Sequence, residues 1–337
     1  MRDNGRGNTM QTAPLNIRNI LLVRNDRFGE FLLNIPALRA IRETFPQAKI
    51  TIAVDPYVRE LAECLPYIDE VVQWSMLRHS LTERFGFIKT LRSKAIDMAI
   101  MLNPTKEFNI FTYILGVPVR VGYDRKWGFL LTHKIKDIKY LGRKHEVEYN
   151  LELVGLIGAG TPDKSLSLSL EAGNAADDLL SGSDIKDDNI LIALHPWTSD
   201  PIKEWPLNNF YELTLRLIGE LKARIVVVGG KEELVTAREL FKGFDQRLID
   251  VTGKTTLKEL AALLKKCRVL ISPDSGPVHL SCAVGTPVIV IFRNDIPAKC
   301  AKRWGPWGKG NFVIEKSRLS DITVDEVFDK VKEALKT

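Results

Sequence analysis

Short apolar runs alternate with amphipathic stretches along most of this 337-residue chain, and this alternation constrains the fold more than any other feature of the sequence. Runs typical of buried parallel strands occupy residues 20–23, 49–54, 70–72, 96–102, 190–194, 224–228, 269–272 and 288–292, with a short one near residue 249. Amphipathic segments typical of helices occupy residues 28–45, 57–64, 145–156, 207–221, 232–241, 257–266, 276–284 and 324–336. The alternation predicts an α/β protein built on doubly wound parallel sheets.

The alternation stops once and then starts again, which divides the chain into two halves. The interruption is a polar, acidic stretch at residues 172–189, rich in Gly, Ser and Asp towards its end. We therefore predict a flexible tail at residues 1–16, a first Rossmann-like domain at 17–175 and a second at 176–320. In the simplest arrangement the two domains face each other across a cleft, with ligands at the carboxyl ends of the strands.

Composition narrows the functional classes. The net charge of +6 at pH 7 lies wholly in the first half, because residues 1–165 hold 24 of the 48 basic residues but only 18 of the 42 acidic residues. Such a charge suits nucleic acid, a membrane surface or an anionic substrate. The four cysteines are scattered without metal-ligand spacing, so we expect reduced thiols in a cytoplasmic protein rather than disulfides or a metal site. No apolar segment resembles a secretory signal or approaches the roughly 20 residues of a membrane-spanning helix, so membrane contact would be peripheral.

The segment from Pro273 to His279 lies between an apolar run and a predicted helix. Ser275 is placed to cap that helix, Gly276 permits close approach of a ligand, and Pro277 suits the first turn. The free amides of such a helix start bind anions, so the segment is a candidate site for a pyrophosphate. Asp274 would repel a phosphate, and we expect it to accept hydrogen bonds from a sugar hydroxyl or from backbone amides. An ordinary capped helix is an equally good interpretation of these residues alone.

Two more loops of the second half follow predicted strands. Thr198, Ser199 and Lys203 follow the first of these strands and offer two hydroxyls and a point charge to a diphosphate. Glu232 and Glu233 follow the next strand, where a carboxylate commonly accepts hydrogen bonds from ribose hydroxyls. A solvated lysine, and glutamates that favour the helix dipole, are the ordinary alternatives.

The first half places Glu30 at the turn between its first strand and the following helix, where the carboxylate would face the cleft. Glu30 is therefore a candidate general base for an incoming hydroxyl, although a glutamate in a first helical turn is also simply favourable electrostatically. Asp26 is the nearest alternative carboxylate. Four basic residues of this half are candidates for contact with an anionic acceptor: Arg27, Arg120, Arg125 and Lys126.

Taken together, these segments resemble the family 9 glycosyltransferases, the group of the lipopolysaccharide ADP-heptose heptosyltransferases, over residues 17–331. The segments that carry the resemblance run from Arg24 to Leu38, Gly122 to Arg125, Lys203 to Pro206, Pro273 to His279, Gly285 to Pro287 and Arg303 to Pro306. The resemblance implies a GT-B fold with the acceptor on the first domain, the nucleotide-sugar on the second, and the last helix (residues 321–337) packed back on the first domain. It also implies an inverting, metal-independent transfer of heptose from ADP-heptose to a lipid A-linked core acceptor, with no cofactor besides the donor substrate.

The resemblance also assigns roles to individual residues. It implies a donor site with these members: Thr198, Ser199 and Lys203 at the phosphates, Asp274, Ser275, Gly276 and His279 around the donor, Glu232 or Glu233 at the ribose, and Gly253, Lys254 and Thr255 near the adenine. The family usually has Asp where this chain has Glu30, and the extra methylene moves the reacting oxygen by about an ångström. We expect Glu30 to be the catalytic base, with Lys203 stabilising the leaving ADP.

Three alternatives stay open at this stage. The protein could transfer another sugar or use another acceptor, or it could bind a nucleotide-sugar without turnover, which the change to Glu30 permits. It could also be a nucleic-acid-binding α/β protein, an alternative that only the basic charge supports. On the main interpretation there is no nucleic-acid partner, and the basic first half meets a phosphorylated glycolipid at the anionic inner leaflet of the cytoplasmic membrane.

Overall fold

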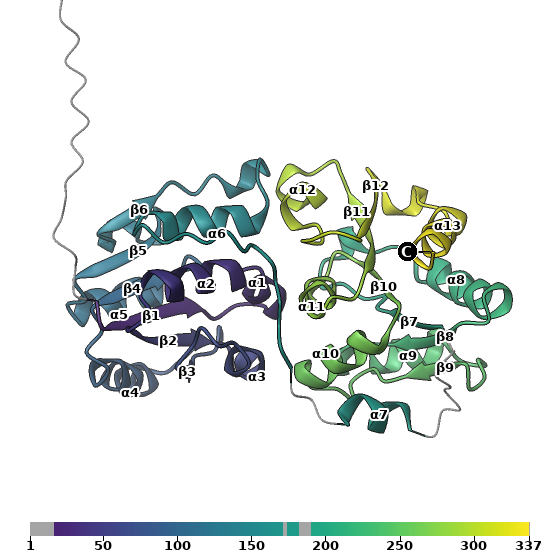
Figure 1. Cartoon of the computed structure of the whole chain (residues 1–337), viewed down its shortest axis with the longest axis horizontal. Coiled ribbons are helices and arrows are strands. Elements are labelled where there is room, and N and C mark those ends of the chain that lie inside the picture. Colours follow the sequence, from purple (N-terminus) through teal and green to yellow (C-terminus); the bar gives the residue numbers. More distant parts are fainter. Residues whose placement is uncertain (1–16, 171–173, 182–189, 337) are drawn as a thin grey trace, which may run out of the picture.

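Two six-stranded sheets, one in each half of the chain, form the frame of the molecule (Figure 1). The computed structural model describes residues 17–170, 174–181 and 190–336, and the predicted tail at 1–16 lies outside them. All strand pairings are parallel, in the orders β3-β2-β1-β4-β5-β6 and β12-β11-β10-β7-β8-β9. Counted within its own half, each sheet has the order 3-2-1-4-5-6 of a Rossmann fold, so the prediction of two Rossmann-like domains is confirmed.

The first domain holds the first half of the described elements. Its strands are β1 (Asn19–Arg24), β2 (Lys49–Val54), β3 (Glu70–Gln73), β4 (Met98–Met101), β5 (Val119–Tyr123) and β6 (His133–Ile135). Its helices are α1 (Phe28–Leu32), α2 (Ile35–Thr44), α3 (Arg59–Glu63), α4 (Leu81–Arg92), α5 (Lys106–Ile114) and α6 (Glu146–Gly155), with short 3-10 helices η1 (Pro56–Val58), η2 (Gly128–Leu130) and η3 (Lys139–Leu141).

The second domain repeats the pattern. Its strands are β7 (Leu191–Leu194), β8 (Arg224–Val227), β9 (Leu248–Asp250), β10 (Val269–Pro273), β11 (Val288–Arg293) and β12 (Phe312–Lys316). Its helices are α7 (Ala175–Leu180), α8 (Leu207–Glu220), α9 (Leu234–Leu240), α10 (Leu257–Lys266), α11 (Gly276–Val284), α12 (Ala301–Trp304) and α13 (Val324–Ala334), with η4 (Pro201–Lys203), η5 (Lys231–Glu233), η6 (Pro297–Lys299) and η7 (Leu319–Asp321). Since α7 packs against α10, the predicted boundary at 175/176 falls at the first residue of an element of the second domain.

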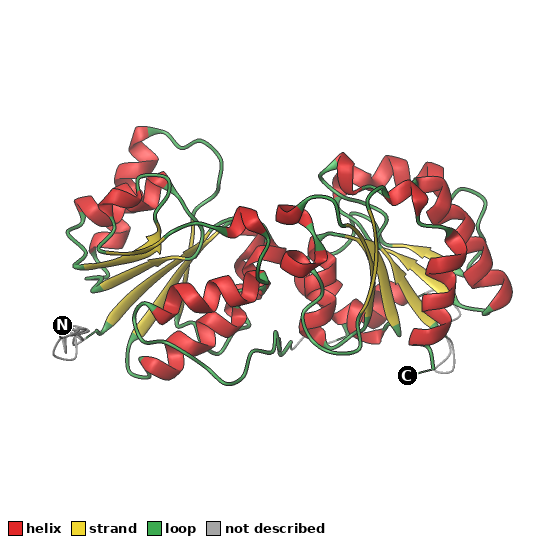
Figure 2. Ribbon diagram, turned by 90° about the horizontal axis from the view of Figure 1, so that it is seen from above, coloured by secondary structure: helices red, strands yellow, loops and turns green. Residues whose placement is uncertain are grey.

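Helices cover both faces of each sheet, as Figure 2 shows with the sheets seen nearly edge-on. The central strands are accordingly buried on both sides: Ile20 to Val23 of β1 are at most 1% exposed. That double burial explains why these strands are continuous apolar runs in the sequence rather than alternating ones.

The segment predicted as one helix at 28–45 is two helices. Helix α1 ends at Leu32 and α2 begins at Ile35, because Pro36 has no N–H to donate to the Leu32 carbonyl and fits the first turn of a new helix instead. The Asn34 side-chain amide donates to the Glu30 carbonyl at 2.7 Å, which satisfies an acceptor at the end of α1. Glu30 therefore sits on a short helix of its own, directly after the central strand.

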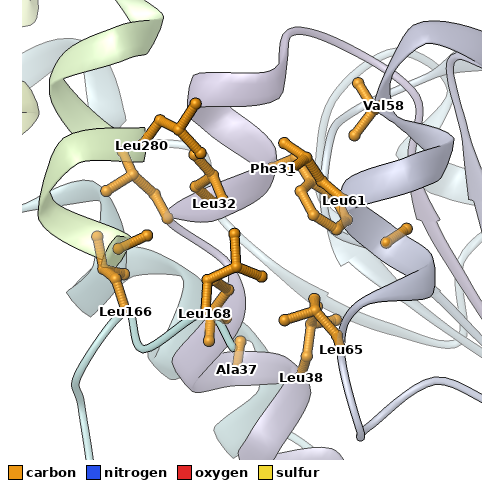
Figure 3. Close-up of a cluster of buried hydrophobic side chains, with 14 of the residues drawn as sticks. Phe31, Leu32, Ala37, Leu38, Val58, Leu61, Leu65, Leu166, Leu168 and Leu280 are labelled. Atoms are coloured by element: carbon orange, nitrogen blue, oxygen red, sulfur yellow. The ribbon is translucent and has the colours of Figure 1, made fainter. Parts of the chain in front are cut away.

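The two domains share one hydrophobic core. The largest cluster of buried side chains includes Phe31 and Leu32 of α1 and Leu280 of α11, together with Leu166 and Leu168 of the chain segment that links the domains. Figure 3 shows these side chains meeting between the helices of the two halves. The interface is therefore built in the same way as the interior of a domain, which fixes the relative position of α1 and α11.

The last helix lies elsewhere than predicted. The apolar face of α13, which includes Val327, Phe328 and Val331, joins the core of the second domain and packs against α8. The prediction that residues 321–337 pack back on the first domain is wrong, because β12 first returns the chain to the edge of the second sheet. Among the described residues, no helix is long and apolar enough to cross a membrane.

Residues 297–307 make the return contact with the first domain instead. His145 hydrogen-bonds the Gly305 carbonyl through Nε2 at 3.0 Å, and its ring packs on Trp307. Gly142 touches Pro297 so closely that a β-carbon there would lie 1.9 Å from the Pro297 carbonyl oxygen. This return segment, residues 297–307, closes one end of the cleft between the domains.

Candidate active site

A pocket of about 450 Å³ opens between the domains at the carboxyl end of the first sheet. Residues of both domains line it: Arg24, Asp26, Glu30, Asn103, Pro104, Asp124, Arg125, Asp137, Lys139, Tyr140 and Glu146 from the first, and Ala298, Arg303 and Trp304 from the return segment. The lining is rich in charge, so its ion pairs decide which groups are free to act on a ligand.

Glu30 differs from the other acidic residues of this pocket. Asp26 pairs with Arg24 at 2.8 Å, Asp137 with Arg125 and Asp124 with Lys134, and Glu146 pairs with two cations. The Glu30 carboxylate forms no ion pair with any described residue. It is the one acidic side chain of the lining whose oxygens are available to take a proton from a ligand.

Burial and neighbouring charges both shift the pKa of Glu30. Loss of solvent, and then the negative charge of Asp26, raise its pKa above the ordinary value of a glutamate, while Arg24 and Arg27 act in the opposite direction. Burial also raises the pKa of Asp26. A raised pKa brings a carboxylate closer to the range in which it exchanges protons with a sugar hydroxyl at neutral pH.

Tyr57 supports the turn that carries Glu30. Its hydroxyl accepts a hydrogen bond from the Phe28 amide at 3.0 Å, which satisfies the first free amide of α1. Burial raises the pKa of Tyr57 to about 12, so the hydroxyl stays neutral. The orientation of α1 is thus fixed at its start by a side chain from η1.

A buried ion cluster links the two domains behind Glu30. Lys139 of η3 pairs with Glu146 at 2.5 Å, and Arg303 of the return segment pairs with the same carboxylate at 3.1 Å. Burial alone would raise the pKa of Glu146, but Lys139, Arg303 and Arg24 together hold it below its ordinary value. This cluster, defined here as Lys139, Glu146 and Arg303, anchors the return segment to the start of α6.

Lys203 lies across the cleft, at the end of η4. Its ammonium pairs with the Asp274 carboxylate, Nζ to Oδ2, at 2.5 Å. Burial raises the pKa of Asp274, an effect that Lys203 partly opposes. This carboxylate therefore holds the lysine in place, and its hydrogen bond to a sugar hydroxyl stays a prediction.

The start of α11 keeps its amides free of side-chain caps. Ser275 does not cap the helix as predicted, because its hydroxyl bonds instead to Ser272 at 2.7 Å and to Nδ1 of His195 at 3.2 Å. His195 is buried, and burial lowers its pKa to about 3, so the ring is neutral in this network. The Gly276 amide, which has no intrahelical partner, remains available to an anion.

Gly276 and Gly29 are required by the contact between the domains. A β-carbon on Gly276 would lie 2.3 Å from the Phe28 ring, and one on Gly29 would lie 3.0 Å from the Gly276 Cα and 3.1 Å from the His279 ring. Gly276 is thus required because Phe28 lies over its Cα, and the approach of a ligand to its amide stays a prediction. His279 is buried beside α1, and burial lowers its pKa to about 3.

The predicted ribose and adenine residues come together at one edge of the second domain. The Gly253 amide donates to the Gly229 carbonyl at 2.9 Å, and the φ of +70° at Gly253 is one that glycine adopts without strain. Glu232 folds back over Gly230, whereas one oxygen of Glu233 is buried without a hydrogen-bond partner among the described residues. Burial, followed by the Glu232 charge, raises the pKa of Glu233. Glu233 is the better candidate for the ribose because it holds an unsatisfied acceptor.

The remaining donor-loop residues lie close to these groups. Thr198 accepts a hydrogen bond from the Asp200 amide at 3.3 Å, and Ser199 beside it is exposed. Lys254 donates to the Asp250 carbonyl at 2.6 Å, and Thr255 is half-buried in the same loop. All of them follow the carboxyl ends of strands in the second sheet.

The four candidate acceptor residues do not form one group. Arg27 is exposed at the start of α1, and Arg125 lines the pocket while pairing with Asp137 at 3.0 Å. Lys126 is exposed outside the pocket lining. Arg120 lies near the start of β5, at the other end of the strand, where its guanidinium donates to the carbonyls of Leu130 and Val117. Arg120 therefore lies apart from the other three and supports the chain around η2, and its contact with an acceptor stays a prediction.

The ion-pair and hydrogen-bond partners of these residues are not visible in the sequence. Lys139, Glu146 and Tyr57 carry no motif, and their roles depend on contacts between distant segments. Arg24 and Arg303 lie inside segments that resemble family motifs, but nothing in the sequence indicates that one binds Asp26 and the other reaches Glu146 from 157 residues away.

Comparison with known proteins agrees with this geometry. A sequence model described as glycosyltransferase family 9 (heptosyltransferase) matches residues 84–327. Lipopolysaccharide heptosyltransferase 1 of Salmonella typhimurium is 24% identical over 329 residues, which are 93% of this chain and 99% of that protein.

Solved structures share the arrangement of both domains. A family 9 glycosyl transferase from Veillonella parvula is 21% identical, with a TM-score of 0.81 over 95% of this chain and 98% of that one. The E. coli ADP-heptose lps heptosyltransferase II is 20% identical, with a TM-score of 0.80 over 94% of this chain and 98% of that one. Since the family model spans more than half of the sequence and the two-domain frame is the same, the chain belongs to glycosyltransferase family 9 and is a glycosyltransferase of the GT-B fold.

Proposed function

We propose that this glycosyltransferase transfers a heptose from ADP-heptose to a lipopolysaccharide core acceptor linked to lipid A, with inversion at the anomeric carbon. The observation that carries the proposal is the position of Glu30, an unpaired carboxylate in the pocket, on a helix packed directly against the start of α11. A base from one domain and an anion-binding helix start from the other are the two groups that a single displacement requires.

On the donor side, Lys203 and the Gly276 amide bind the diphosphate. Asp274 pairs with Lys203, so the donor phosphates take over part of that ion pair on binding. Glu233 accepts hydrogen bonds from the ribose hydroxyls, and the loop at Gly253 lies beside the adenine. The names of the relatives support ADP-heptose as the donor, since the E. coli structure compared above is an ADP-heptose enzyme.

The reaction is a single displacement. The acceptor hydroxyl oxygen attacks the anomeric carbon and forms the new glycosidic bond while the bond to the ADP oxygen breaks. Glu30 takes the proton of the hydroxyl, and the negative charge that builds on the leaving ADP is stabilised by Lys203 and by the amides at the start of α11. These groups compensate the diphosphate charge, so we propose that no metal ion and no cofactor is required.

We also propose where the enzyme works. The excess of positive charge lies in residues 1–165, and the acceptor is a phosphorylated glycolipid. Such an acceptor places the enzyme in the cytoplasm at the anionic inner leaflet of the cytoplasmic membrane, as a peripheral protein.

Nucleotide binding tests the donor. ADP should raise the melting temperature of the protein more than UDP or GDP at the same concentration, because a ligand that binds only the folded state stabilises it by mass action. A preference for UDP would show that the donor is a different nucleotide-sugar.

Two substitutions test the catalytic groups with ADP-heptose and an acceptor. Glu30→Gln should abolish transfer while the ADP-induced shift in melting temperature persists, and unchanged transfer would remove Glu30 as the base. Lys203→Ala should lower kcat by roughly 10²- to 10³-fold, the usual loss for a preorganised charge stabiliser. Lys265→Ala, a change of an exposed lysine on α10, is the matched control and should leave turnover unchanged.

A further inference from the structure

Exposed apolar side chains gather on one part of the first domain. Met76, Leu77, Leu81 and Phe85, around the start of α4, are 66% to 79% exposed, and Trp127 and Phe129 at η2 are 47% and 70% exposed. Five of the six most exposed large hydrophobic side chains among the described residues are in this set. We call these six residues the α4–η2 surface. Scattered single apolar residues are ordinary on a protein surface, but such a concentration is not.

The α4–η2 surface belongs to one layer of the fold. Phe87 of α4, Phe108 of α5 and Leu131 after η2 share a small buried core on the same face of the sheet. Arg84 of α4 pairs with Glu107 of α5 at 3.0 Å, and Asn109 of α5 donates to the Lys126 carbonyl at 3.0 Å. Helix α5 is therefore bonded to both parts of the surface.

The same surface lies beside the pocket. The Met76 amide donates to Asp55 at 3.3 Å, and Asn25 donates to the Trp74 carbonyl at 3.3 Å. These bonds tie the loop before α4 to the turn that carries Glu30. At the other end, Arg125 lines the pocket two residues before Trp127. The loop before α4 is thus bonded to the loops after β1 and β2, and Trp127 follows closely on a residue of the pocket lining.

Helix α4 turns an unusual face to solvent. Only Phe87 and Leu91 of its residues are buried, while Leu81 and Phe85, four residues apart, lie on one exposed side. Residues 76–92 carry one acidic residue and four basic ones: Arg78, Arg84, Lys89 and Arg92. Of these basic residues, only Arg84 has an ion-pair partner in the described parts of the chain. The segment therefore combines exposed apolar side chains with uncompensated positive charge.

We propose that the α4–η2 surface docks onto an anionic lipid bilayer. Apolar side chains that enter the headgroup region and basic residues that meet anionic headgroups are the two terms that hold a peripheral protein at such a surface. The inference rests on the proposed function, because it gives the enzyme a defined orientation towards a membrane-embedded acceptor. Docked in this way, the pocket opening faces the bilayer and the acceptor approaches Glu30 from it.

Vesicle sedimentation tests the surface with the full chain. The protein should sediment with vesicles of phosphatidylcholine mixed with phosphatidylglycerol, and high salt should release it. The double variant Leu77→Ser with Phe85→Ser should bind these vesicles at least about tenfold more weakly, because two large apolar side chains no longer leave water. Arg78→Gln and Lys89→Gln should each weaken binding by about fivefold, the effect of one basic residue near an anionic surface.

A matched control uses the second domain. Leu215 of α8 and Val235 of α9 are 49% and 67% exposed, so Leu215→Ser with Val235→Ser removes similar apolar side chains from a different face. This control should sediment like the wild type. The proposal is overturned if the wild type stays in the supernatant, if the control loses as much binding as the α4–η2 variant, or if sedimentation velocity shows that the surface instead joins two copies of the chain.

Different results would contradict the docking surface and the proposed function. If anionic vesicles bind the protein through this surface but ADP gives no thermal shift, the donor assignment is wrong and the docking surface stands. If ADP binds and a water-soluble acceptor is glycosylated but no vesicle is bound, the docking surface is wrong and the enzyme assignment stands. The α4–η2 variant should keep its turnover with the water-soluble acceptor.

Discussion

The surroundings of Glu30 disfavour its ionised form, and this should make the transfer reaction depend on pH. A general base acts in its ionised form, and burial together with Asp26 raises the pKa of Glu30. The value of kcat/KM should therefore fall with decreasing pH along a limb centred above about 4.3, the ordinary pKa of a glutamate. Asp26→Asn removes one of the groups that raise this pKa and frees Arg24, which lowers it, so the limb should move to lower pH. Initial rates across pH, with ADP binding as the check on folding, measure the shift. An unmoved limb would assign it to another group.

Glu146 should matter more for stability than for chemistry. Glu146→Gln leaves Lys139 and Arg303 buried beside a neutral side chain, so we expect a loss of about 3–5 kcal/mol in the free energy of unfolding. The pKa of Glu146 is lowered in the folded protein, so this stabilisation is present above its unfolded pKa and is lost as the pH falls through its folded one. Urea denaturation at neutral and acidic pH measures both effects. Glu152→Gln on the same helix, which loses only an exposed pair with Lys144, should leave stability unchanged.

The sequence predicts where single site residues lie better than it predicts which residues pair with one another. The positions of Glu30, Lys203 and Asp274 follow from their place after a strand, and the structure puts all three at strand ends. Their partners do not follow, because the Lys203 pair with Asp274 and the Glu146 pair with Arg303 join residues far apart in the chain. Arg120 shows the converse: the guanidinium of a basic residue in a basic stretch donates to the carbonyls of Leu130 and Val117.

At the scale of elements, two glycines in helices have opposite roles. Gly86 lies inside α4 with no atom near the place of its missing β-carbon, whereas Gly29 in α1 lies against the backbone of α11. Gly86→Ala should raise the free energy of unfolding by about 0.5–1 kcal/mol, because alanine loses less backbone entropy in a helix. Gly29→Ala should lower it and weaken ADP binding, since α1 and α11 must separate. Denaturant midpoints and ADP titrations of both variants measure these changes, and a stabilising Gly29→Ala would contradict the packing.

Burial explains which strands and helices can be predicted from the sequence and which cannot. Strands buried on both faces, such as β1 and β7, appear as continuous apolar runs, and long amphipathic helices such as α8 and α10 are visible from their spacing. The edge strands β6 and β12 are partly exposed, and the buried strand β5 is interrupted in sequence by Arg120 and Gly122, so none of the three is visible as a long apolar run. Helix α4 was missed because its exposed side is apolar, so it lacks the ordinary contrast between an inner and an outer face.

At the scale of the whole molecule, the shared core predicts coupled unfolding. Leu280 is fully buried in the cluster that also contains Phe31 and Leu32 of the other domain. Calorimetry of the wild type should show one transition. Leu280→Ala should lower the free energy of unfolding by about 2–5 kcal/mol and separate the domains into two transitions. Leu217→Ala, a change in the core of the second domain alone, should cost a similar amount and keep one transition. Two transitions in the wild type would show that the domains unfold independently.

The identical strand order of the two sheets makes the loops after β1 and β7 equivalent positions. Glu30 follows the first and Lys203 the second, so the candidate base and the candidate phosphate-binding lysine occupy equivalent positions in the two sheets. On the proposed function, substitutions in the first domain would alter which acceptor is glycosylated, and substitutions in the second would alter which donor is used. The contact between Gly29 of α1 and Gly276 of α11 limits such exchange. A chimera that joins the first domain of one relative to the second domain of another should be active only if both glycines are kept.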